Sequence, residues 1–394
     1  MRVVIANKFA HLTGGADQHC LGLATALVAR GHEVRFLSTA DERNIAPDGV
    51  FIPVTVTHDS REGLPPHRQA AVFGKALWNQ SAADATQRLI DTFRPDVLHA
   101  HKLYPQLSVA PVVVARRAGI PVVQTLHDFE MIGASPIDAR GGIWDPDETR
   151  LRFKLLNSAT RPVHRHVHAP RVSAFVAVSR FVARVHEKYG IQASVLPNFV
   201  TPADVPFDGL PTYADRTGIV FVGRLRPEKG ALDLIELARL QPSISVTVVG
   251  SGDLQSELRK AAAELPNLHI AGFVADPALR AAVRGARVAV IPSRCQDAGP
   301  LVPLEAMANA TPVVAYAMGG LGEYVSDAGG GRVVPVDVVA LASTAAELHD
   351  DRAMWETHAR RGYDAVATRH TPAAYVEQLE DVYERAVASR GARR

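Results

Sequence analysis

Short apolar runs alternate with stretches of helical spacing along the first half of the chain. Residues 3–6 form a β-rich run, and apolar side chains then recur every three or four positions, which predicts a helix. Gly31 ends that helix, and a new β-rich run begins. Residues 94–101 and 121–129 repeat the strand pattern. Repeated strand–helix units predict a doubly wound parallel α/β sheet. The apolar positions of the predicted helix are Cys20, Leu23, Ala24 and Leu27.

The same alternation resumes after a break in the middle of the chain. From 201 to 217 the sequence is rich in Pro, Asp and Gly without periodicity, which is typical of an interdomain linker. Strand patterns follow at 218–222, 287–292 and 312–317, and a last helical pattern covers 373–386. A chain of 394 residues is too long for one ordinary core. Two domains are therefore expected.

Composition narrows the class of protein. A hydrophobic content of 47% with 21% charged residues is typical of a globular chain. The net charge of +2 comes from basic residues spread along the sequence, which argues against a nucleic-acid partner. Two cysteines, Cys20 and Cys295, cannot build a disulfide framework, which favours a reducing compartment. Neither a signal peptide nor a membrane span is evident, so a cytoplasmic location is expected.

Two carboxylates stand out in the stretch 291–308. Asp297 follows a predicted central strand, and open α/β sheets bind ligands at the carboxyl ends of their strands. Glu305 falls on a predicted helix anchored by its apolar neighbours Leu304, Met307 and Ala308. A carboxylate can accept two hydrogen bonds at once, which suits the vicinal hydroxyls of a ribose, while the loop carboxylate can reach a second ring.

Two loops have the chemistry of phosphate binding. The strand at 218–222 delivers Arg224 and Lys229 to one loop, which supplies a bidentate fork and a point charge for a diphosphate. Near the N-terminus, Gly14 and Gly15 open a helix whose free N–H groups would favour an anion, although a plain tight turn explains them equally well. They do not match Gly-x-Gly-x-x-Gly, which argues against a nicotinamide dehydrogenase.

These stretches resemble the retaining glycosyltransferases of family 4, also described as glycosyl transferases group 1. The family usually writes Ser-x-x-Glu-Gly-Phe-Gly-Leu-Pro-x-Leu-Glu-Ala; here Asp297 replaces the first Glu, Ala298-Gly299-Pro300 replaces Gly-Phe-Gly, and Glu305 is the second Glu. Residues 218–230 are the second match. Pro300 lacks the N–H that a glycine would offer to the donor's phosphates. The resemblance covers nearly the whole chain and is weakest over 130–169.

The resemblance implies the GT-B fold, in which two Rossmann-like domains face each other across a cleft. Residues 1–200 would form the acceptor-binding domain and 201–375 the nucleotide-sugar-binding domain, and the helix 376–394 would cross back to the first domain. Retaining transfer without a metal ion or a cofactor is implied. The donor would be a nucleotide-diphosphate sugar, with UDP or GDP expected, and the acceptor a small molecule, a glycan or a lipid-linked sugar.

The resemblance also assigns roles to single residues. Arg224 and Lys229 would hold the charge of the leaving diphosphate, whose oxygen takes the acceptor's proton. Asp297 and His127 would contact the transferred sugar, and Glu305 the ribose. The backbone of Gly272, Phe273 and Val274 would hold the base. The remaining predicted donor-binding residues are Gly14, Gly15, Gly299, Pro300 and Leu301.

Several alternatives stay open or are set aside. A sugar-nucleotide epimerase shares the GT-B architecture, and a non-catalytic sugar-binding receptor is a further alternative, which would normally be exported. Asp145-Pro-Asp147 imitates an Asp-x-Asp metal motif but lies in loop sequence, within a stretch at 130–150 that is a candidate for acceptor recognition. Among His164, His166 and His168, only the first and last share a helix face, and a solvated basic helix is expected rather than a metal site. Peripheral membrane contact through Arg-rich helices and the oligomeric state are not settled by the sequence.

Overall fold

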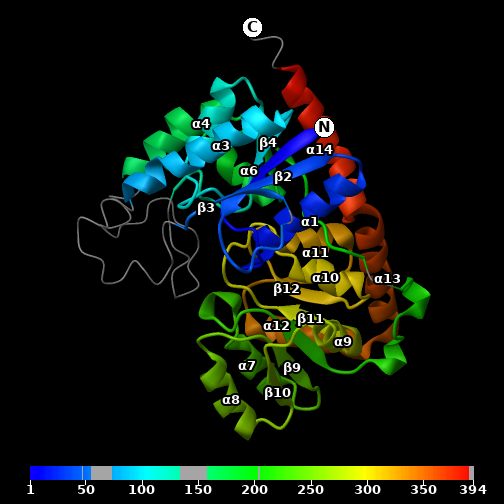
Figure 1. The fold of residues 1–394 in the computed structure, drawn as a ribbon. Coiled ribbons are helices and arrows are strands. Elements are labelled where there is room, and N and C mark those ends of the chain that lie inside the picture. The colour runs from blue at the N-terminus through cyan, green and yellow to red at the C-terminus, as the bar shows by residue number, and fades with distance from the viewer. Residues whose placement is uncertain (47, 55–72, 134–157, 203–204, 390–394) are drawn as a thin grey trace. The chain divides into compact units, whose positions relative to one another are not determined.

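The computed structural model describes residues 1–46, 48–54, 73–133, 158–202 and 205–389. The chain divides into two compact units (Figure 1). The first takes in the described residues up to Leu196 together with those from Pro372, and the second runs from Pro197 to Thr371. Within the described part of the chain, no helix combines the length and the apolar character needed to cross a membrane.

A seven-stranded, fully parallel sheet forms the centre of the first unit. The order is β3-β2-β1-β4-β5-β6-β7, so the chain builds outward from β1 in one direction and then from β4 in the other. The predicted doubly wound sheet is confirmed. The strands are β1 (Arg2–Ala6), β2 (Glu33–Thr39), β3 (Gly49–Ile52), β4 (Val97–Ala100), β5 (Val122–Leu126), β6 (Ala174–Ala177) and β7 (Ala193–Val195).

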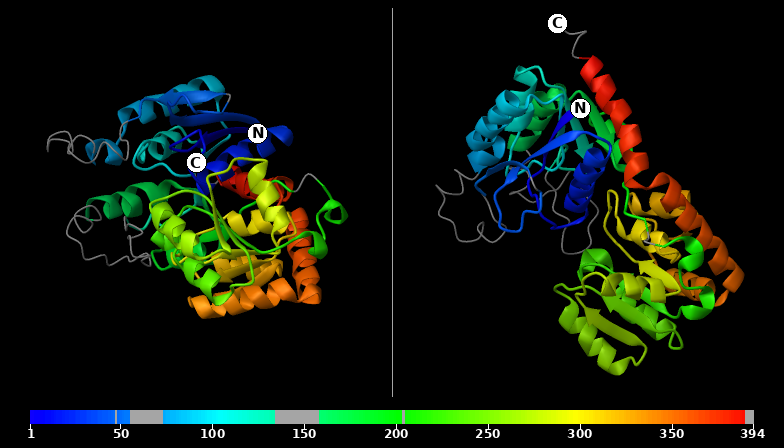
Figure 2. Two further views of the ribbon diagram at one scale, coloured as in Figure 1. Left: turned by 90° about the horizontal axis from the view of Figure 1, so that it is seen from below. Right: turned by 45° about the vertical axis from the view of Figure 1, so that its right-hand side comes forward.

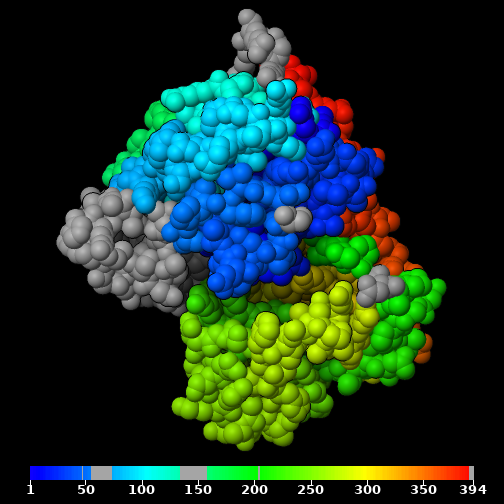
Figure 3. Space-filling view, viewed as in Figure 1, coloured from blue at the N-terminus to red at the C-terminus, as the bar shows by residue number. Residues whose placement is uncertain are grey.

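Helices cover this sheet because one stripe of each is apolar. Helix α1 (Gly15–Ala29) buries Cys20, Leu23 and Leu27, as its spacing predicted. Helix α3 (Gln80–Phe93) begins at Asn79, whose side chain accepts hydrogen bonds from two backbone N–H groups of the first turn; it forms much of the cyan surface in Figure 3. The other helices are α4 (Ala110–Arg117), the π-helix η1 (Val163–His168), the 3-10 helix η2 (Ala169–Arg171), α6 (Arg180–Glu187) and α14 (Pro372–Ala388).

The C-terminal helix α14 belongs to the first unit. Its apolar stripe packs against α1 and against strands β4 and β5. The phenol of Tyr383 on α14 lies 2.6 Å from Nδ1 of His99 in the middle of β4, and both side chains are buried. A segment more than 280 residues later in the chain therefore completes the core of the N-terminal sheet. The buried stripe consists of Tyr375, Val376, Leu379, Val382, Tyr383 and Ala386.

The second unit repeats the architecture with six parallel strands in the order β10-β9-β8-β11-β12-β13. Figure 2 shows this unit, coloured from green to orange, in two further views. Alternate side chains of its strands enter two separate cores, one on each face of the sheet. In β8, Ile219 and Phe221 pack on one face and Val220 on the other. The strands are β8 (Ile219–Val222), β9 (Val246–Val249), β10 (Leu268–Gly272), β11 (Val288–Ile291), β12 (Val313–Tyr316) and β13 (Gly331–Val334).

Helices lie on both faces of this sheet. The core that contains Phe221 also takes side chains from α7, α8 and α12, whereas the core that contains Val220 takes them from α9, α10, α11 and α13. Their bounds are α7 (Asp233–Leu240), α8 (Gln255–Glu264), α9 (Ala278–Gly285), α10 (Val302–Ala308), α11 (Leu321–Ala328), α12 (Val338–Asp350) and α13 (Arg352–Arg369), with 3-10 helices η3 (Phe207–Gly209), η4 (Tyr213–Asp215) and η5 (Pro227–Lys229).

The stretch predicted as a linker packs onto the second unit over residues 205–217. Leu210 is buried in a small apolar cluster with Trp355. Arg216 is 1% exposed, and its guanidinium donates to the backbone carbonyl of Pro211 and to Oγ1 of Thr311 while lying 5.2 Å from the Trp355 ring. The linker interpretation is therefore wrong for these residues. Scattered apolar side chains without a period anchor the segment, which a search for periodicity does not detect.

Candidate active site

The topology of the second unit marks one position on its sheet. Strands β8 and β11 are neighbours, and the chain winds away from them in opposite directions, to β9 and β10 on one side and to β12 and β13 on the other. Such a switch point opens a crevice at the carboxyl ends of the two strands, where α/β proteins bind ligands. The loop after β8 carries Arg224 and Lys229, and the loop after β11 carries Asp297.

Lys229 and Asp297 form an ion pair at this switch point. The ammonium Nζ of Lys229 lies 2.5 Å from Oδ1 of Asp297, and both side chains are largely buried. The hydroxyl of Ser293 donates to Oδ2 of the same carboxylate at 2.7 Å. Burial disfavours the charge on Lys229, but Asp297 and then Cys295 outweigh it, so the pKa of Lys229 is raised and the side chain stays protonated.

Backbone contacts hold the two loops together. The carbonyl of Glu228 accepts hydrogen bonds from the N–H groups of Arg294, at 2.9 Å, and Cys295, at 3.2 Å. Gly230 then turns with a φ of 68°, and a Cβ at this position would collide with the carbonyl of Pro292. Only glycine adopts this conformation cheaply and leaves room for the second loop. Gly230 of the Lys-Gly dipeptide thus lets the two loops pack closely, and Lys229 provides a positive charge.

The other predicted residues of the second unit lie around the same edge of the sheet. Arg224 is exposed just after β8. Glu305 lies half-buried on α10, whose neighbouring positions Leu304 and Met307 are buried as predicted. The Asn198 amide donates to the carbonyl of Gly299 at 2.7 Å and so holds the turn that leads through Pro300 and Leu301 into α10.

The Gly272 to Val274 turn lies at the end of β10. Gly272 has a φ of 74°, and its carbonyl accepts the N–H of Gly250 at the end of the neighbouring strand. Phe273 is 77% exposed, which is unusual for so large an apolar side chain, whereas Val274 packs against the core. The exposed aromatic ring offers a flat face on which another ring can stack.

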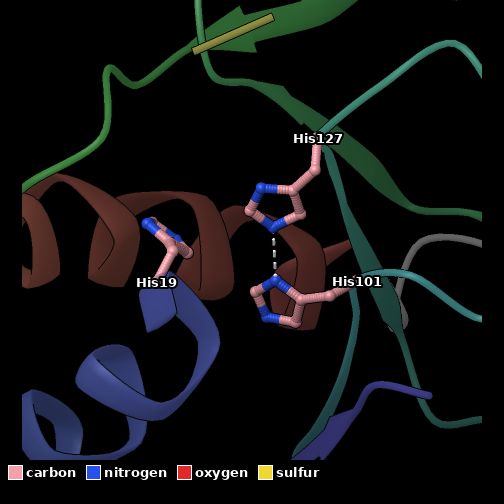
Figure 4. Close-up of side chains that lie close together, drawn as sticks. All are labelled: His19, His101 and His127. Atoms are coloured by element: carbon pink, nitrogen blue, oxygen red, sulfur yellow. Dashed lines mark hydrogen bonds between the residues drawn. The ribbon is translucent and has the colours of Figure 1, made fainter. Parts of the chain in front are cut away.

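In the first unit, His127 lies at the carboxyl end of β5 and belongs to a cluster of histidines (Figure 4). Nδ1 of His101, which follows β4, lies 2.9 Å from Nε2 of His127, and the two rings are stacked. His19 on α1 completes the cluster, with its ring centroid 5.1 Å from that of His127. Because β1 and β4 are the switch point of this sheet, these side chains also gather at a ligand-binding edge.

Burial keeps this cluster neutral. Desolvation lowers the pKa of His19 to about 3, and burial followed by repulsion among neighbouring imidazoles lowers the pKa of His101 and of His127 well below the usual value. His99 lies against His101, with ring centroids 4.2 Å apart, and its second nitrogen is 2.8 Å from Oγ1 of Thr125. The imidazoles are therefore hydrogen-bonding groups or ligands at neutral pH rather than cations.

Two carboxyl groups, those of Asp128 and Glu130, lie just after His127 in the chain. Lys102 pairs with Asp128 at 2.6 Å, and this pairing outweighs burial and lowers the pKa of Asp128. Glu130 accepts the N–H of Tyr104 at 3.0 Å, yet burial and the charge of Asp128 raise the pKa of Glu130 to about 7. The two carboxyl groups thus differ in charge near neutral pH, which sequence reasoning did not foresee.

The predicted glycine turn of the first unit precedes α1. Gly14 is the N-cap of α1, and a Cβ there would meet no atom within 4 Å, so the space beside it is open. Asp17 in the first helical turn is buried and is held by the amide of Asn7, at 2.9 Å, and by the hydroxyl of Thr13. Hydrogen bonds to Asp17 therefore hold this turn, and Gly14 and Gly15 are exposed.

The interpretation of the segment at 163–168 as a solvated helix is wrong for two of its three histidines. His164 and His168 are buried, and only His166 is exposed. His168 lies 3.1 Å from the amide oxygen of Gln124 and 3.1 Å from the hydroxyl of Tyr104. The shared face of His164 and His168 was foreseen, but the face turns inward because their helix packs on the sheet. Asp145 and Asp147 lie outside the described residues.

The sequence analysis missed two members of the histidine cluster. Neither His101 nor His19 stood out in the sequence as a site residue. Their positions could have indicated a site, since His101 follows β4 and His19 lies on α1. Parallel strands beside a switch point bring their carboxyl ends together. Which of the sixteen histidines meet could not be read from spacing.

Two family models match successive parts of the chain. The model described as Glycosyltransferase Family 4 matches residues 13–204, and the one described as Glycosyl transferases group 1 matches residues 207–366. The first match lies almost entirely in the first unit and the second lies in the second unit, and together they leave residues 1–12, 205–206 and 367–394 unmatched.

Similar proteins agree with these matches. A phosphatidyl-myo-inositol mannosyltransferase of Mycolicibacterium smegmatis is 29% identical over 390 residues, covering 94% of this chain and 90% of the relative. A glycogen synthase of Mycobacterium tuberculosis is 28% identical over 379 residues, covering 88% of this chain and 85% of the relative. Among solved structures, HepE of Anabaena in complex with UDP superposes with a TM-score of 0.71 at 17% identity, covering 98% of this chain and all of that one.

Proposed function

This chain belongs to the family 4 glycosyltransferases of GT-B fold, and we propose that it moves a sugar from a nucleotide-diphosphate donor to an acceptor hydroxyl with retention of the anomeric configuration and without a metal ion. The Lys229–Asp297 pair is the observation that carries this proposal. It sets a cation suited to phosphate beside a carboxylate suited to sugar hydroxyls, at the switch point of the second sheet.

Lys229 and Arg224 have complementary parts in the proposed reaction. The ammonium has three donors, of which Asp297 accepts one and the sulfur of Cys295, at 3.7 Å, accepts another, so one remains for a phosphate oxygen. Arg224 is exposed just after β8 and would bring a planar fork to the same diphosphate. Both charges are present before the bond breaks, and they stabilise the leaving group as its negative charge grows.

Retention is proposed to follow a front-face route. The leaving phosphate oxygen accepts the proton of the acceptor hydroxyl while the new glycosidic bond forms on the same face of the sugar. Asp297 is a poor nucleophile for a double displacement, because Lys229 and Ser293 each occupy one of its carboxylate oxygens. Its proposed part is therefore to bind a sugar hydroxyl.

The remaining roles stay proposals from the family resemblance. Glu305 would bind the ribose, Gly272 to Val274 the base, and the Gly299 to Leu301 turn the donor. His127 is proposed to contact the sugar as a neutral imidazole, in line with its lowered pKa. Gly14 and Gly15 would offer backbone N–H groups to an anionic part of a substrate.

A panel of nucleotide sugars tests the proposal. The UDP complex of HepE makes UDP-sugars the first donors to try, followed by GDP-sugars. The names of the mannosyltransferase and glycogen synthase relatives favour inositol-lipid and α-glucan acceptors as starting points. Transfer should release nucleoside diphosphate only when an acceptor is present, and NMR of the product should show the donor's anomeric configuration. An epimerised donor, an inverted product or binding without turnover would each overturn the proposal.

A further inference from the structure

The geometry points to a binding site for a zinc-like transition-metal ion in the first unit, formed by His19, His101 and His127. One nitrogen from each ring lies within 4.8 Å of the other two. Figure 4 shows the rings converging from three separate elements: α1, the end of β4 and the end of β5. Three imidazoles with an open fourth position are a common ligand set for zinc.

The His101–His127 pair needs little adjustment to hold an ion, whereas the nitrogen of His19, which lies within 4.8 Å of the other two, has to move closer to them. Two imidazole nitrogens bound to one tetrahedral zinc stand about 3.3 Å apart, since each Zn–N bond is about 2.05 Å. Nδ1 of His101 and Nε2 of His127 are 2.9 Å apart. A separation of about 0.4 Å more would admit the ion. That change lies within the reach of small ring rotations on a backbone held by two neighbouring parallel strands.

The protonation state also suits a metal. One nitrogen of the His101–His127 pair must carry the proton that joins the two rings. Nε2 of His101 is buried and has no hydrogen-bond partner among the described residues, so the ring can move its proton there when Nδ1 binds the ion. Because burial already keeps all three imidazoles neutral, no ligand has to give up a proton to solvent.

The residues around the three histidines hold two of the rings in place and leave the third partly exposed. The ring of His99 lies against that of His101, and Tyr375 packs edge-on against His19, so neighbouring rings hold both histidines. His127 is the one partly exposed member of the cluster, which provides a path for the ion. Lys102 and Asp128 are the charged side chains that act on His127. They form an ion pair, and their opposite effects on the imidazole largely cancel.

Zinc at this site would inhibit transfer, because the metal would occupy the imidazole that we propose for the sugar. This consequence rests on the proposed function, whereas binding of the ion does not. Metal binding is therefore measured without donor or acceptor, so that a failure of the site and a failure of the transferase assignment can be told apart.

Calorimetry on tag-free protein, first stripped with EDTA, tests the site with ZnCl₂ and with CoCl₂. We expect one ion per chain and the visible spectrum of tetrahedral Co²⁺. His101→Gln and His19→Gln should each weaken Zn²⁺ binding by about a hundredfold or more, since losing a ligand should cost no less than losing an outer-shell partner. His166→Gln removes an exposed histidine outside the cluster and should bind like wild type. Mg²⁺ should not bind, because the site has no oxygen ligands from the protein.

X-ray absorption at the zinc edge keeps the inference testable if the variants fail to fold. The wild-type protein should show three imidazoles at about 2.0–2.1 Å and one oxygen. Fewer than three imidazoles, or a folded His101→Gln variant that binds Zn²⁺ as tightly as wild type, would overturn the site. Inhibition by Zn²⁺, reversed by EDTA in wild type and absent in a folded and active His101→Gln, would support its effect on transfer.

Discussion

The ammonium of Lys229 and the carboxylate of Asp297 pair at 2.5 Å although 68 positions separate them in the chain. Each follows a different strand, β8 or β11, and the two strands are neighbours only because the sheet winds outward from this point. Removing either member leaves the other partly buried without its countercharge, which is costly. The pair therefore contributes to the local stability of the second unit and, in the proposed function, links that stability to donor binding.

Loss of either cation should slow transfer strongly. Lys229→Ala and Arg224→Ala are each expected to lower kcat by roughly a hundredfold, because each removes positive charge already in place for the leaving group. Arg239→Ala, an exposed arginine of α7, is the matched control and should behave like wild type. Steady-state kinetics with the complete donor measures the effect, and wild-type turnover in either variant would show that the diphosphate assignment is wrong.

Asp297 and Glu305 should differ in what they bind. Asp297→Ala is expected to cost transfer about 1.5–3 kcal/mol or more, the value of a hydrogen bond to a charged group, with nucleoside diphosphate affinity changed only a few-fold. Glu305→Ala should instead weaken the nucleotide itself. Titration calorimetry with nucleoside diphosphate, beside transfer kinetics, separates the two. Equal loss of nucleotide affinity in both variants would contradict the assignment.

Transfer should survive excess EDTA. The proposed site offers two fixed cations where other glycosyltransferases use a divalent ion, so a chelator removes nothing that the reaction needs. The rate with EDTA should equal or exceed the rate without it, since EDTA would also strip ions from the histidine cluster. Activity lost to EDTA and restored by Mn²⁺ or Mg²⁺ would instead direct attention to Asp145 and Asp147.

Glu130 should make the first unit less stable as the pH rises. Its pKa is about 7 in the folded chain and 4.5 ordinarily. Between these values the unfolded chain has lost a proton that the folded chain keeps, so this contribution to stability falls from about pH 4.5 to about pH 7 and is constant above. Glu130→Gln keeps the oxygen that accepts the Tyr104 N–H and removes the titration. The gain in Tm of the variant over wild type should therefore be larger at pH 8 than at pH 5. A gain that is the same at both values would show that Glu130 does not titrate in this way.

Gly230→Ala should destabilise the second unit and weaken nucleotide binding together. The added Cβ meets the Pro292 carbonyl, and the positive φ adds strain, for a cost of about 1–3 kcal/mol. If the backbone at Gly230 shifted to relieve this clash, it would move Lys229 away from Asp297. Gly285→Ala at the end of α9 meets no atom within 4 Å and serves as the control. Thermal unfolding and calorimetry should show both losses in the first variant and neither in the second; a Gly230→Ala variant with wild-type Tm would contradict the packing argument.

The sequence alone determined the order of strands and helices and the doubly wound sheets. The spacing of apolar residues and the apolar runs are local properties of the chain. Lys229, Asp297 and Glu305 could be singled out for the same reason, since each lies in a short stretch whose chemistry and family resemblance are visible without coordinates. The sequence could not predict that His164 and His168 are buried, or that Leu210 packs against Trp355. Burial depends on which elements meet in the folded chain. Only the tertiary structure decided that Lys229 contacts Asp297 and that His19, His101 and His127 converge. Both arrangements arise where a parallel sheet reverses its winding and brings the carboxyl ends of sequence-distant strands to one edge.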